Sequence, residues 1–243
     1  MPSDWRRTQI DMPFSLFRKS KSPIDPLTIE LKKHRLFAFS QEGEDLLINR
    51  ILNNKSEGFF IDIGAHHPIR FSNTYFFYRK GWRGINVDAM PGAMKAFEQF
   101  RPEDTNIEAA ISNKAEQLTY FRFNEPALNT FVESEALKKD GLQGYRIEER
   151  ISIQTTTLAE LISKYLPEGK EVDFLTIDVE GLDLAVLESN DWSRVKPKLI
   201  VVEDLTKDLD LILKNSATKT YLESKGYRLF SKMFNTCMYL RED

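Results

Sequence analysis

Short apolar runs alternate with amphipathic segments along most of this chain. The apolar run over Gly58–Gly64 ends in a glycine turn, and a second short run follows at Ile85–Asp88. Runs of this length that are bounded by turn residues predict buried strands. Residues 73–81, between the two runs, predict a helix that ends at a glycine. This order of strand, helix and strand is typical of a parallel sheet.

Two further helices are predicted from their starting residues. Ser40 is a suitable N-terminal cap, because several acidic residues follow it in the first turn. Pro91 predicts the start of another helix, since proline is favoured in the first turn. We expect Met94, Phe97 and Phe100 to face inward from that helix.

The regular alternation stops after a third strand, which is predicted at residues 106–111. Residues 118–123 predict an added strand, and residues 124–150 are polar without a regular period. Connections of this length are usually lids or binding loops. We interpret residues 124–150 as a lid or insert over an acceptor site, with an irregular surface segment as the alternative.

Regular patterning returns after this segment. Thr157 and Glu160 have the spacing of a capping box, which predicts the start of a helix. The remaining predicted elements are strands at 172–177, 198–202, 227–231 and 236–240, and helices at 182–189 and 217–225. The last two strands predict a closing antiparallel hairpin. The expected fold class is therefore α/β, with a mostly parallel sheet, helices on both faces and a C-terminal hairpin.

The length and composition fit one such domain. The chain has 243 residues, and we divide it into an N-terminal arm at 1–39 and a single domain at 40–243. Prolines and basic residues dominate the start of the arm. We interpret it as loosely ordered, with contact to a membrane surface or a partner as the alternative.

Charge and cysteine content exclude several classes of protein. A net charge of −3 gives no electrostatic signature of nucleic-acid binding. Cys237 is the single cysteine, so an internal disulfide and a cysteine-rich metal site are both excluded. No apolar run approaches the ~20 residues that a membrane-spanning helix needs. We expect a cytoplasmic protein, and the sequence leaves a homo-oligomer open.

Acidic residues follow successive predicted strands of the parallel sheet. They are Asp62, Asp88, Asp178 and the pair Glu203 and Asp204. In open α/β sheets, ligands bind beyond the carboxyl ends of the strands, near the point where the strand order reverses. A single acid at such a position could be a helix cap, but a series of them predicts a binding site.

The turn after the first strand favours one type of ligand. Gly64 and Ala65 allow close approach to a ligand, but the spacing does not match the GxGxxG pattern of dinucleotide sites. Asp62 would repel a pyrophosphate and attract a positive amino or sulfonium group. Asp88 lies at the end of the next strand, where a carboxylate can accept hydrogen bonds from ribose hydroxyls. These features favour S-adenosylmethionine over a nicotinamide dinucleotide.

Several stretches together resemble the FkbM-type methyltransferases, a branch of the Rossmann-like class I methyltransferases. They are Ser40–Asp45, Phe60–His66, Ser72–Thr74, Gly81–Gly84, Ala110–Ser112, Asp173–Gly181 and Val202–Glu203. The resemblance implies S-adenosylmethionine as cofactor and O-methylation of a sugar, glycolipid or small metabolite. Thr176 departs from the family pattern, because many relatives carry a lysine at this position.

The resemblance also implies roles for individual residues. The expected cofactor-binding residues are Asp62, Gly64 and Ala65 at the methionine end, Asp88 at the ribose, Ala110 and Ile111 at the adenine, and Asn73 from the next helix. Deprotonation of an acceptor hydroxyl needs a base or a metal. The expected catalytic residues are Asp178, Glu180 and His66. Asp178, Glu203 and Asp204 also resemble the acidic metal cluster of some sugar O-methyltransferases and would suit Mg²⁺.

Other functions share parts of this pattern. A nicotinamide-dependent oxidoreductase would share the sheet and the ribose acid but lacks the glycine pattern here. A non-catalytic Rossmann-like binding module would keep the fold without the acceptor chemistry. A nucleic-acid methyltransferase is disfavoured by the charge balance. We expect a small-molecule or glycan acceptor and no nucleic-acid partner.

Overall fold

The computed structural model describes Glu30 and residues 32–242. The chain divides into two compact units, residues 1–37 and 38–243. Most of the predicted N-terminal arm lies outside the described residues, and its proposed membrane or partner contact stays a prediction. The second unit contains every strand described below and the entire candidate site.

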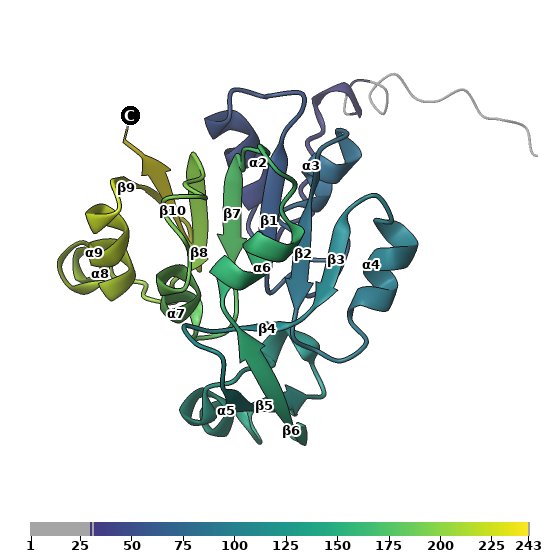
Figure 1. Cartoon of the computed structure of the whole chain (residues 1–243), viewed down its shortest axis with the longest axis vertical. Helices are drawn as coiled ribbons and strands as arrows, with labels where there is room; N and C mark the ends of the chain where they lie inside the picture. Colours follow the sequence, from purple (N-terminus) through teal and green to yellow (C-terminus); the bar gives the residue numbers. More distant parts are fainter. Residues whose placement is uncertain (1–29, 31, 243) are drawn as a thin grey trace, which may run out of the picture. The chain divides into compact units, whose positions relative to one another are not determined.

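A seven-stranded sheet forms the centre of the second unit (Figure 1). Its spatial order is β3-β2-β1-β7-β8-β10-β9. The strands are β1 (Phe59–Ile63), β2 (Arg83–Asp88), β3 (Thr105–Glu108), β7 (Phe174–Ile177), β8 (Leu199–Glu203), β9 (Tyr227–Lys232) and β10 (Thr236–Arg241). The first five run parallel, and β10 pairs antiparallel with both β8 and β9. The predicted mostly parallel sheet with a closing hairpin is confirmed.

Helices cover both faces of this sheet, as the sequence predicts. They are α2 (Glu44–Ile51), α3 (Tyr75–Arg79), α4 (Met94–Phe100), α6 (Leu158–Tyr165), α7 (Asp183–Glu188), α8 (Leu209–Asn215) and α9 (Ala217–Ser224). Alternate residues of β1 point to opposite sides: Ile61 packs in a core with α6, α7 and α9, and Phe60 packs in a second core with α2 and α3. The sheet is thus buried on both faces, which explains its nearly continuous apolar strands.

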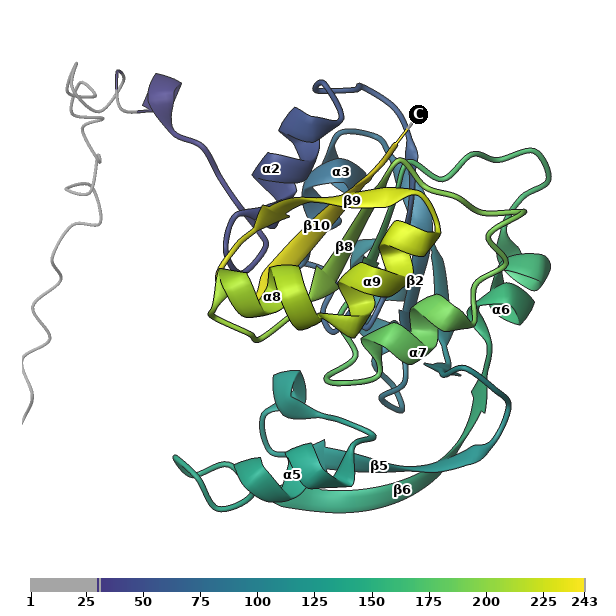
Figure 2. The same cartoon turned by 90° about the vertical axis from the view of Figure 1, so that its left-hand side faces the viewer.

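A smaller three-stranded sheet is inserted between β3 and α6. It contains β4 (Ala110–Ile111), β5 (Gln117–Phe123) and β6 (Ile147–Thr156), with the 3-10 helix η1 (Pro126–Leu128) and helix α5 (Glu133–Lys139) between β5 and β6. Figure 2 shows β5, β6 and α5 lying together apart from the main sheet. The irregular alternative for residues 124–150 is therefore not what the structure shows, because η1, α5 and the start of β6 lie within this segment.

Three local predictions are corrected by the structure. Helix α2 begins at Glu44 after Gly43, and Ser40 instead exchanges hydrogen bonds with Asp45. The predicted strand at 106–111 is two strands, because the chain leaves the main sheet at Ala109 and pairs with β6. Phe100, predicted to face inward, is 47% exposed. Within the described residues, no helix is both long and apolar enough to cross a membrane.

The two phenylalanines of α4 give a direct test of this helix orientation. Phe97 is fully buried, whereas Phe100 is largely exposed on the same helix. We expect Phe97→Ala to lower the free energy of unfolding by about 3–5 kcal/mol, because it leaves a cavity in the core. Phe100→Ala is the matched control and should cost less than about 1 kcal/mol. Urea denaturation measures both, and equal losses would contradict the orientation.

Candidate active site

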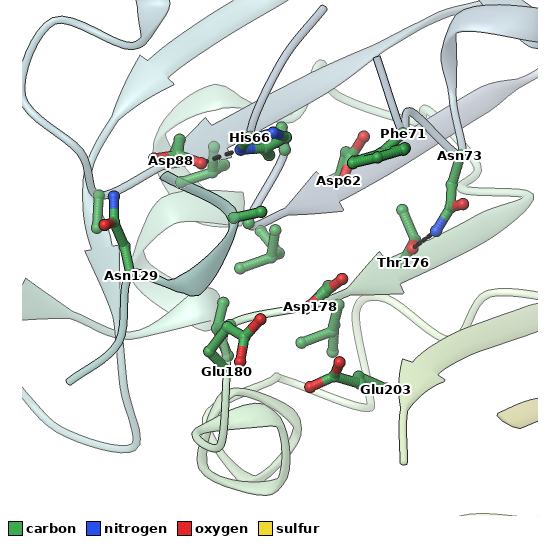
Figure 3. A pocket seen from close by; sticks show the side chains of 18 of the residues that line it. Asp62, His66, Phe71, Asn73, Asp88, Asn129, Thr176, Asp178, Glu180 and Glu203 are labelled. Atoms are coloured by element: carbon green, nitrogen blue, oxygen red, sulfur yellow. Dashed lines mark hydrogen bonds between the residues drawn. The ribbon is translucent and has the colours of Figure 1, made fainter. Parts of the chain in front are cut away.

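A cavity of about 380 Å³ opens where the strand order reverses, between β1 and β7. Figure 3 shows many of its lining side chains, which come from the carboxyl ends of the parallel strands, from the loops that follow them and from the inserted segment. Ligand sites of open α/β sheets occur at this kind of switch point, and the volume is in the usual range for a small-molecule pocket. The sequence-predicted site residues Asp62, Asp88 and Asp178 all line this cavity.

The turn after β1 brings two strand ends into backbone contact. Gly64 has a φ of +83°, and a Cβ added to it would collide with the carbonyl oxygen of Asp178. The N–H groups of Gly64 and Ala65 both donate to the Val87 carbonyl, at 2.9 and 3.0 Å. The Asp178 N–H donates to the Ile63 carbonyl at 2.9 Å. Glycine is therefore required at position 64 by both its conformation and this close approach.

Asp62 is buried at the base of the cavity. Its Oδ2 accepts a hydrogen bond of 2.7 Å from the Thr74 hydroxyl. Burial raises the pKa of Asp62 to about 6, and the Thr74 hydrogen bond and the charge of Arg101 limit the rise. Within the described residues its Oδ1 accepts no hydrogen bond, so this oxygen can receive a donor from a ligand.

Asp88 holds the loop that follows β1. Its two carboxylate oxygens accept backbone N–H groups from His66 and Met90, each at 2.8 Å. Burial raises the pKa of Asp88, and these two hydrogen bonds oppose the rise. Each oxygen keeps a lone pair, so the carboxylate can still accept from ligand hydroxyls.

His66 lies on the same loop with a φ of +54°. Its ring stacks on Phe71 with centroids 6.4 Å apart, and its buried Nε2 has no hydrogen-bond partner within the described part of the chain. Burial and the nearby charge of Arg70 lower the pKa of His66, which favours the neutral imidazole. A neutral ring can exchange a hydrogen bond with a ligand.

Asn73 contacts Thr176, the residue that differs from the lysine of many relatives. The Asn73 amide Nδ2 donates to the Thr176 hydroxyl at 3.0 Å, and both residues line the cavity. A lysine at position 176 would place an ammonium group here. This chain instead has a neutral polar pair at the same place.

The two residues predicted to flank the adenine are placed differently. Ile111 lines the cavity together with Ala109. Ala110 is buried in the pairing of β4 with β6 and does not line it. The alternation of side chains along the extended backbone explains this difference, because neighbouring residues point to opposite sides.

Three carboxylates meet at the other end of the cavity. Asp178, Glu180 and Glu203 each place an oxygen within 4.8 Å of the others (Figure 3). Asp178 keeps solvent-exposed surface, but desolvation by the cavity walls and then the charge of Glu203 raise its pKa well above the ordinary value. Burial and then the charge of Glu180 raise the pKa of Glu203 to about 8. Crowding of this kind disfavours the simultaneous ionisation of neighbouring carboxyl groups.

Asp204 does not belong to this cluster, contrary to the predicted metal set of Asp178, Glu203 and Asp204. Its Oδ1 accepts the Thr206 N–H at 2.9 Å, so the side chain closes a local turn. Glu180 takes its place beside Asp178 and Glu203. Adjacent residues on an extended strand face opposite sides, which explains why Glu203 and Asp204 separate.

The inserted segment holds Glu180 through contacts that the sequence analysis missed. The Lys139 ammonium donates to Glu180 Oε2 at 2.6 Å, and the Thr130 hydroxyl donates to the Glu180 carbonyl at 2.7 Å. Glu180 has a φ of +53°, which is uncommon for a residue with a side chain. No local motif marks Lys139 or Thr130, because their roles depend on how the insert folds.

The insert also supplies aromatic and amide groups to the cavity. Tyr120 packs against Phe131 with ring centroids 4.7 Å apart, and both residues line the cavity. The Asn129 amide contacts the Met90 sulfur at 3.5 Å. These contacts reach the Asp88 end of the cavity, so the insert covers both ends of the site. The aromatic residues of the insert were the sequence signal from which its contribution to the cavity could have been predicted.

The sheet order, the switch-point cavity and the carboxylates at its strand ends together define a Rossmann-like α/β protein with a ligand site of the nucleotide-binding type. The methyltransferase FkbM domain profile matches residues 62–229. This match spans more than half of the chain, which therefore belongs to the FkbM-domain methyltransferases. A comparison with curated proteins finds no match.

Solved methyltransferase structures show a weaker likeness. A TehB-like SAM-dependent methyltransferase from Corynebacterium glutamicum is 9% identical, with 88% of this chain and 94% of that chain covered at a TM-score of 0.41. Precorrin-6y C5,15-methyltransferase from Geobacter metallireducens is 14% identical, with 87% and 95% covered at a TM-score of 0.40. A SAM-dependent methyltransferase from Geobacter sulfurreducens, in complex with S-adenosyl-L-homocysteine, is 12% identical. The match covers 84% of this chain and 71% of that chain at a TM-score of 0.36. The family assignment rests on the domain match.

The raised pKa of Glu203 predicts a pH-dependent stability effect. In the folded state Glu203 keeps its proton up to about pH 8, whereas the unfolded state loses it near 4.5. The wild type therefore loses stability as pH rises through this window, and Glu203→Gln should not. We expect the variant to gain about 1–3 kcal/mol at pH 8 and little at pH 4.5, measured by chemical denaturation.

The exposed Glu168 provides the matched control for this charge removal. Glu168→Gln should leave stability nearly unchanged at both pH values, because the Glu168 side chain is exposed. A gain from Glu203→Gln that is the same at pH 4.5 and pH 8 would contradict the clustered carboxylates.

Proposed function

We propose that this methyltransferase binds S-adenosylmethionine in the switch-point cavity and transfers its methyl group to a hydroxyl of a small or sugar-like acceptor. The observation that carries the proposal is the placement of buried Asp62 and half-buried Asp88 along one cavity, beside the close turn at Gly64. The Asp62 carboxylate suits the ammonium group of the cofactor, and the Asp88 carboxylate suits the two ribose hydroxyls.

The assignment of cofactor groups follows the order of the strand ends. Asp62, Gly64 and Ala65 receive the methionine end, with Asn73 close by. Asp88 accepts the ribose hydroxyls. Ala109 and Ile111, rather than Ala110, flank the adenine, with Tyr120 of the insert nearby. This arrangement places the sulfonium methyl toward the Asp178 end of the cavity.

The charge of the cavity restricts the acceptor. Its charged lining residues are six acids, Glu44, Asp62, Asp88, Asp178, Glu180 and Glu203, and one lysine, Lys139. Such a lining attracts the cationic cofactor and repels phosphates and carboxylates. We therefore propose an uncharged hydroxyl compound, such as a neutral sugar or glycolipid headgroup, as the acceptor.

The acid cluster is suited to remove the proton of that hydroxyl. The oxygen attacks the methyl carbon in line with the departing sulfur, and its proton passes to a carboxylate of the Asp178–Glu203 pair. A base whose pKa lies near the working pH is effective in such a transfer. Glu180 shapes the pair, and neutral His66 offers a hydrogen bond at the cofactor end.

A divalent cation is the second way to activate the hydroxyl. Mg²⁺ would be held by Asp178, Glu180 and Glu203, whose hard oxygen donors suit it, and would lower the pKa of a coordinated hydroxyl. The Lys139 ammonium already provides a positive charge at Glu180. We favour the carboxylate base, because the Lys139 ammonium offsets part of the negative charge that would otherwise attract a metal ion.

The insert is proposed to act as the acceptor lid. Residues 124–150 line the acid end through Lys139 and the cofactor end through Asn129. The backbone bridge between Phe121 and Thr130 fixes this segment to β5. We propose that it orients both substrates and excludes water from the reacting atoms.

Cofactor binding is tested by titration calorimetry on the full chain. We expect S-adenosylmethionine to bind and NAD⁺ not to bind. Asp62→Asn keeps the shape of the side chain but removes its charge, and it should weaken binding at least tenfold, roughly the value of one charge-assisted hydrogen bond. The control is Glu98→Gln, an exposed acid on α4, which should bind as the wild type does. Preferential binding of NAD⁺ would contradict the proposal.

The base is tested by methyl transfer from labelled cofactor to a panel of neutral glycans and small alcohols. Asp178→Asn should lower kcat by about 10²–10⁴ while the cofactor Kd changes only a few-fold. Activity of the wild type should rise with pH toward about 8, because the Glu203 pKa is near that value.

Asp204→Asn is the matched control and should keep wild-type turnover, since Asp204 lies outside the cluster. A chelator separates the two ways of activation: undiminished turnover supports the carboxylate base, and loss restored by Mg²⁺ supports the metal. Full turnover in Asp178→Asn would contradict both.

A further inference from the structure

A buried charged network lies directly behind the cavity. Arg101, at the C-terminal end of α4, is fully buried and forms an ion pair with Asp104 at 2.8 Å. Asp104 in turn accepts the Gly84 N–H at 2.9 Å and the Asn86 amide at 3.1 Å, which anchors the pair to β2. Burying an ion pair costs desolvation free energy, and apolar side chains could fill the same space. The Arg101–Asp104 pair is therefore expected to have a role other than packing.

The guanidinium of Arg101 reaches toward Asp62 through one side chain. Its Nη1 donates to the Thr74 hydroxyl at 2.9 Å, and that hydroxyl lies 2.7 Å from Asp62 Oδ2. Rings of Phe60, Tyr78 and Phe97 surround the guanidinium at 5.3, 5.3 and 5.5 Å from their centroids. The guanidinium is therefore fixed in position.

This arrangement determines the direction of the hydroxyl proton. A guanidinium has donors and no acceptor, so the Thr74 oxygen accepts from Arg101 and its single proton points to Asp62. Thr74 is the N-cap of α3, but its hydroxyl makes no capping bond. Ser72 accepts the Tyr75 N–H instead, at 3.0 Å. The Thr74 hydroxyl therefore does not cap the helix, as a threonine at this position usually does, but donates to Asp62.

We propose that Arg101, acting through Thr74, is a positioning residue that keeps Asp62 ionised and correctly oriented for the cofactor. Among the described residues Arg101 does not line the cavity; its Nη1 reaches Asp62 through the Thr74 hydroxyl and also donates to the hydroxyl of Ser72, a lining residue, at 3.4 Å. The proposal rests on the proposed function for the identity of the ligand, but the state of Asp62 can be measured without any ligand.

The charged groups around Asp62 set the sign of the expected pH effect. They are Arg101, Asp88, Asp104 and Asp178. Among them only Arg101 favours the ionised form of Asp62, while the acids and burial oppose it. The pKa of Asp62 is about 6, so loss of the Thr74 hydrogen bond should raise it further. The ionised fraction of Asp62 should then fall at pH values near its pKa of about 6 and change little well above it.

The test uses full-length protein with ¹³Cγ-labelled aspartate, and Asp62→Asn identifies the Asp62 signal. Thr74→Val removes the hydroxyl but keeps the branched shape, and Thr74→Ser keeps the hydroxyl. We expect an NMR titration to show a raised Asp62 pKa in Thr74→Val and a nearly unchanged one in Thr74→Ser. If Thr74→Val fails to fold, Thr74→Cys, a weaker donor, replaces it and should shift the pKa in the same direction.

Cofactor affinity supplies a second readout. Calorimetry with S-adenosylmethionine should show roughly a tenfold weaker Kd for Thr74→Val at pH 5.5 and a much smaller difference at pH 8. A purely structural role would weaken binding by the same factor at every pH. That result, or an unchanged Asp62 pKa in Thr74→Val, would overturn the proposal. Absence of cofactor binding by the wild type would refute the proposed function and leave the NMR result to decide this inference.

Discussion

The site depends on a backbone contact between two turns. The chain after β1 passes so close to the chain after β7 that the Asp178 carbonyl occupies the space where residue 64 would carry a side chain. Hydrogen bonds from Gly64 and Ala65 to Val87, and from Asp178 to Ile63, join the ends of three neighbouring strands. Asp62, Asp88 and Asp178 converge on one cavity because these strand ends cannot move apart.

The hydrophobic pattern was sufficient to predict the main sheet. Runs such as Phe59–Ile63 and Leu199–Glu203 are apolar except for one acid each, because helices cover both of their faces. Carboxyl ends of parallel strands share one edge, so the convergence of Asp62, Asp88 and Asp178 could also be predicted. Phe100 was misplaced because helical spacing alone does not distinguish the last turn, which extends beyond the core.

The insert could not be derived in the same way. Strand β6 is mostly solvent-exposed and carries charged residues, so its sequence gives little apolar signal. Its structure comes from pairing with β5, a contact between residues far apart in the chain. The roles of Lys139 and Thr130 follow from that pairing. Asp204 was misassigned for the converse reason, since neighbours in sequence on a strand face opposite directions.

The acidity of the cavity has a consequence for turnover. Before transfer, the sulfonium of the proposed cofactor contributes a positive charge that the surrounding carboxylates stabilise. After the proposed transfer the sulfur would be a neutral thioether, and the acceptor proton would have passed to the carboxylates. The electrostatic attraction that favours loading is therefore weaker once the methyl group has left. A lining of this kind would distinguish the methylated cofactor from the spent one by charge, and so it would favour departure of the product.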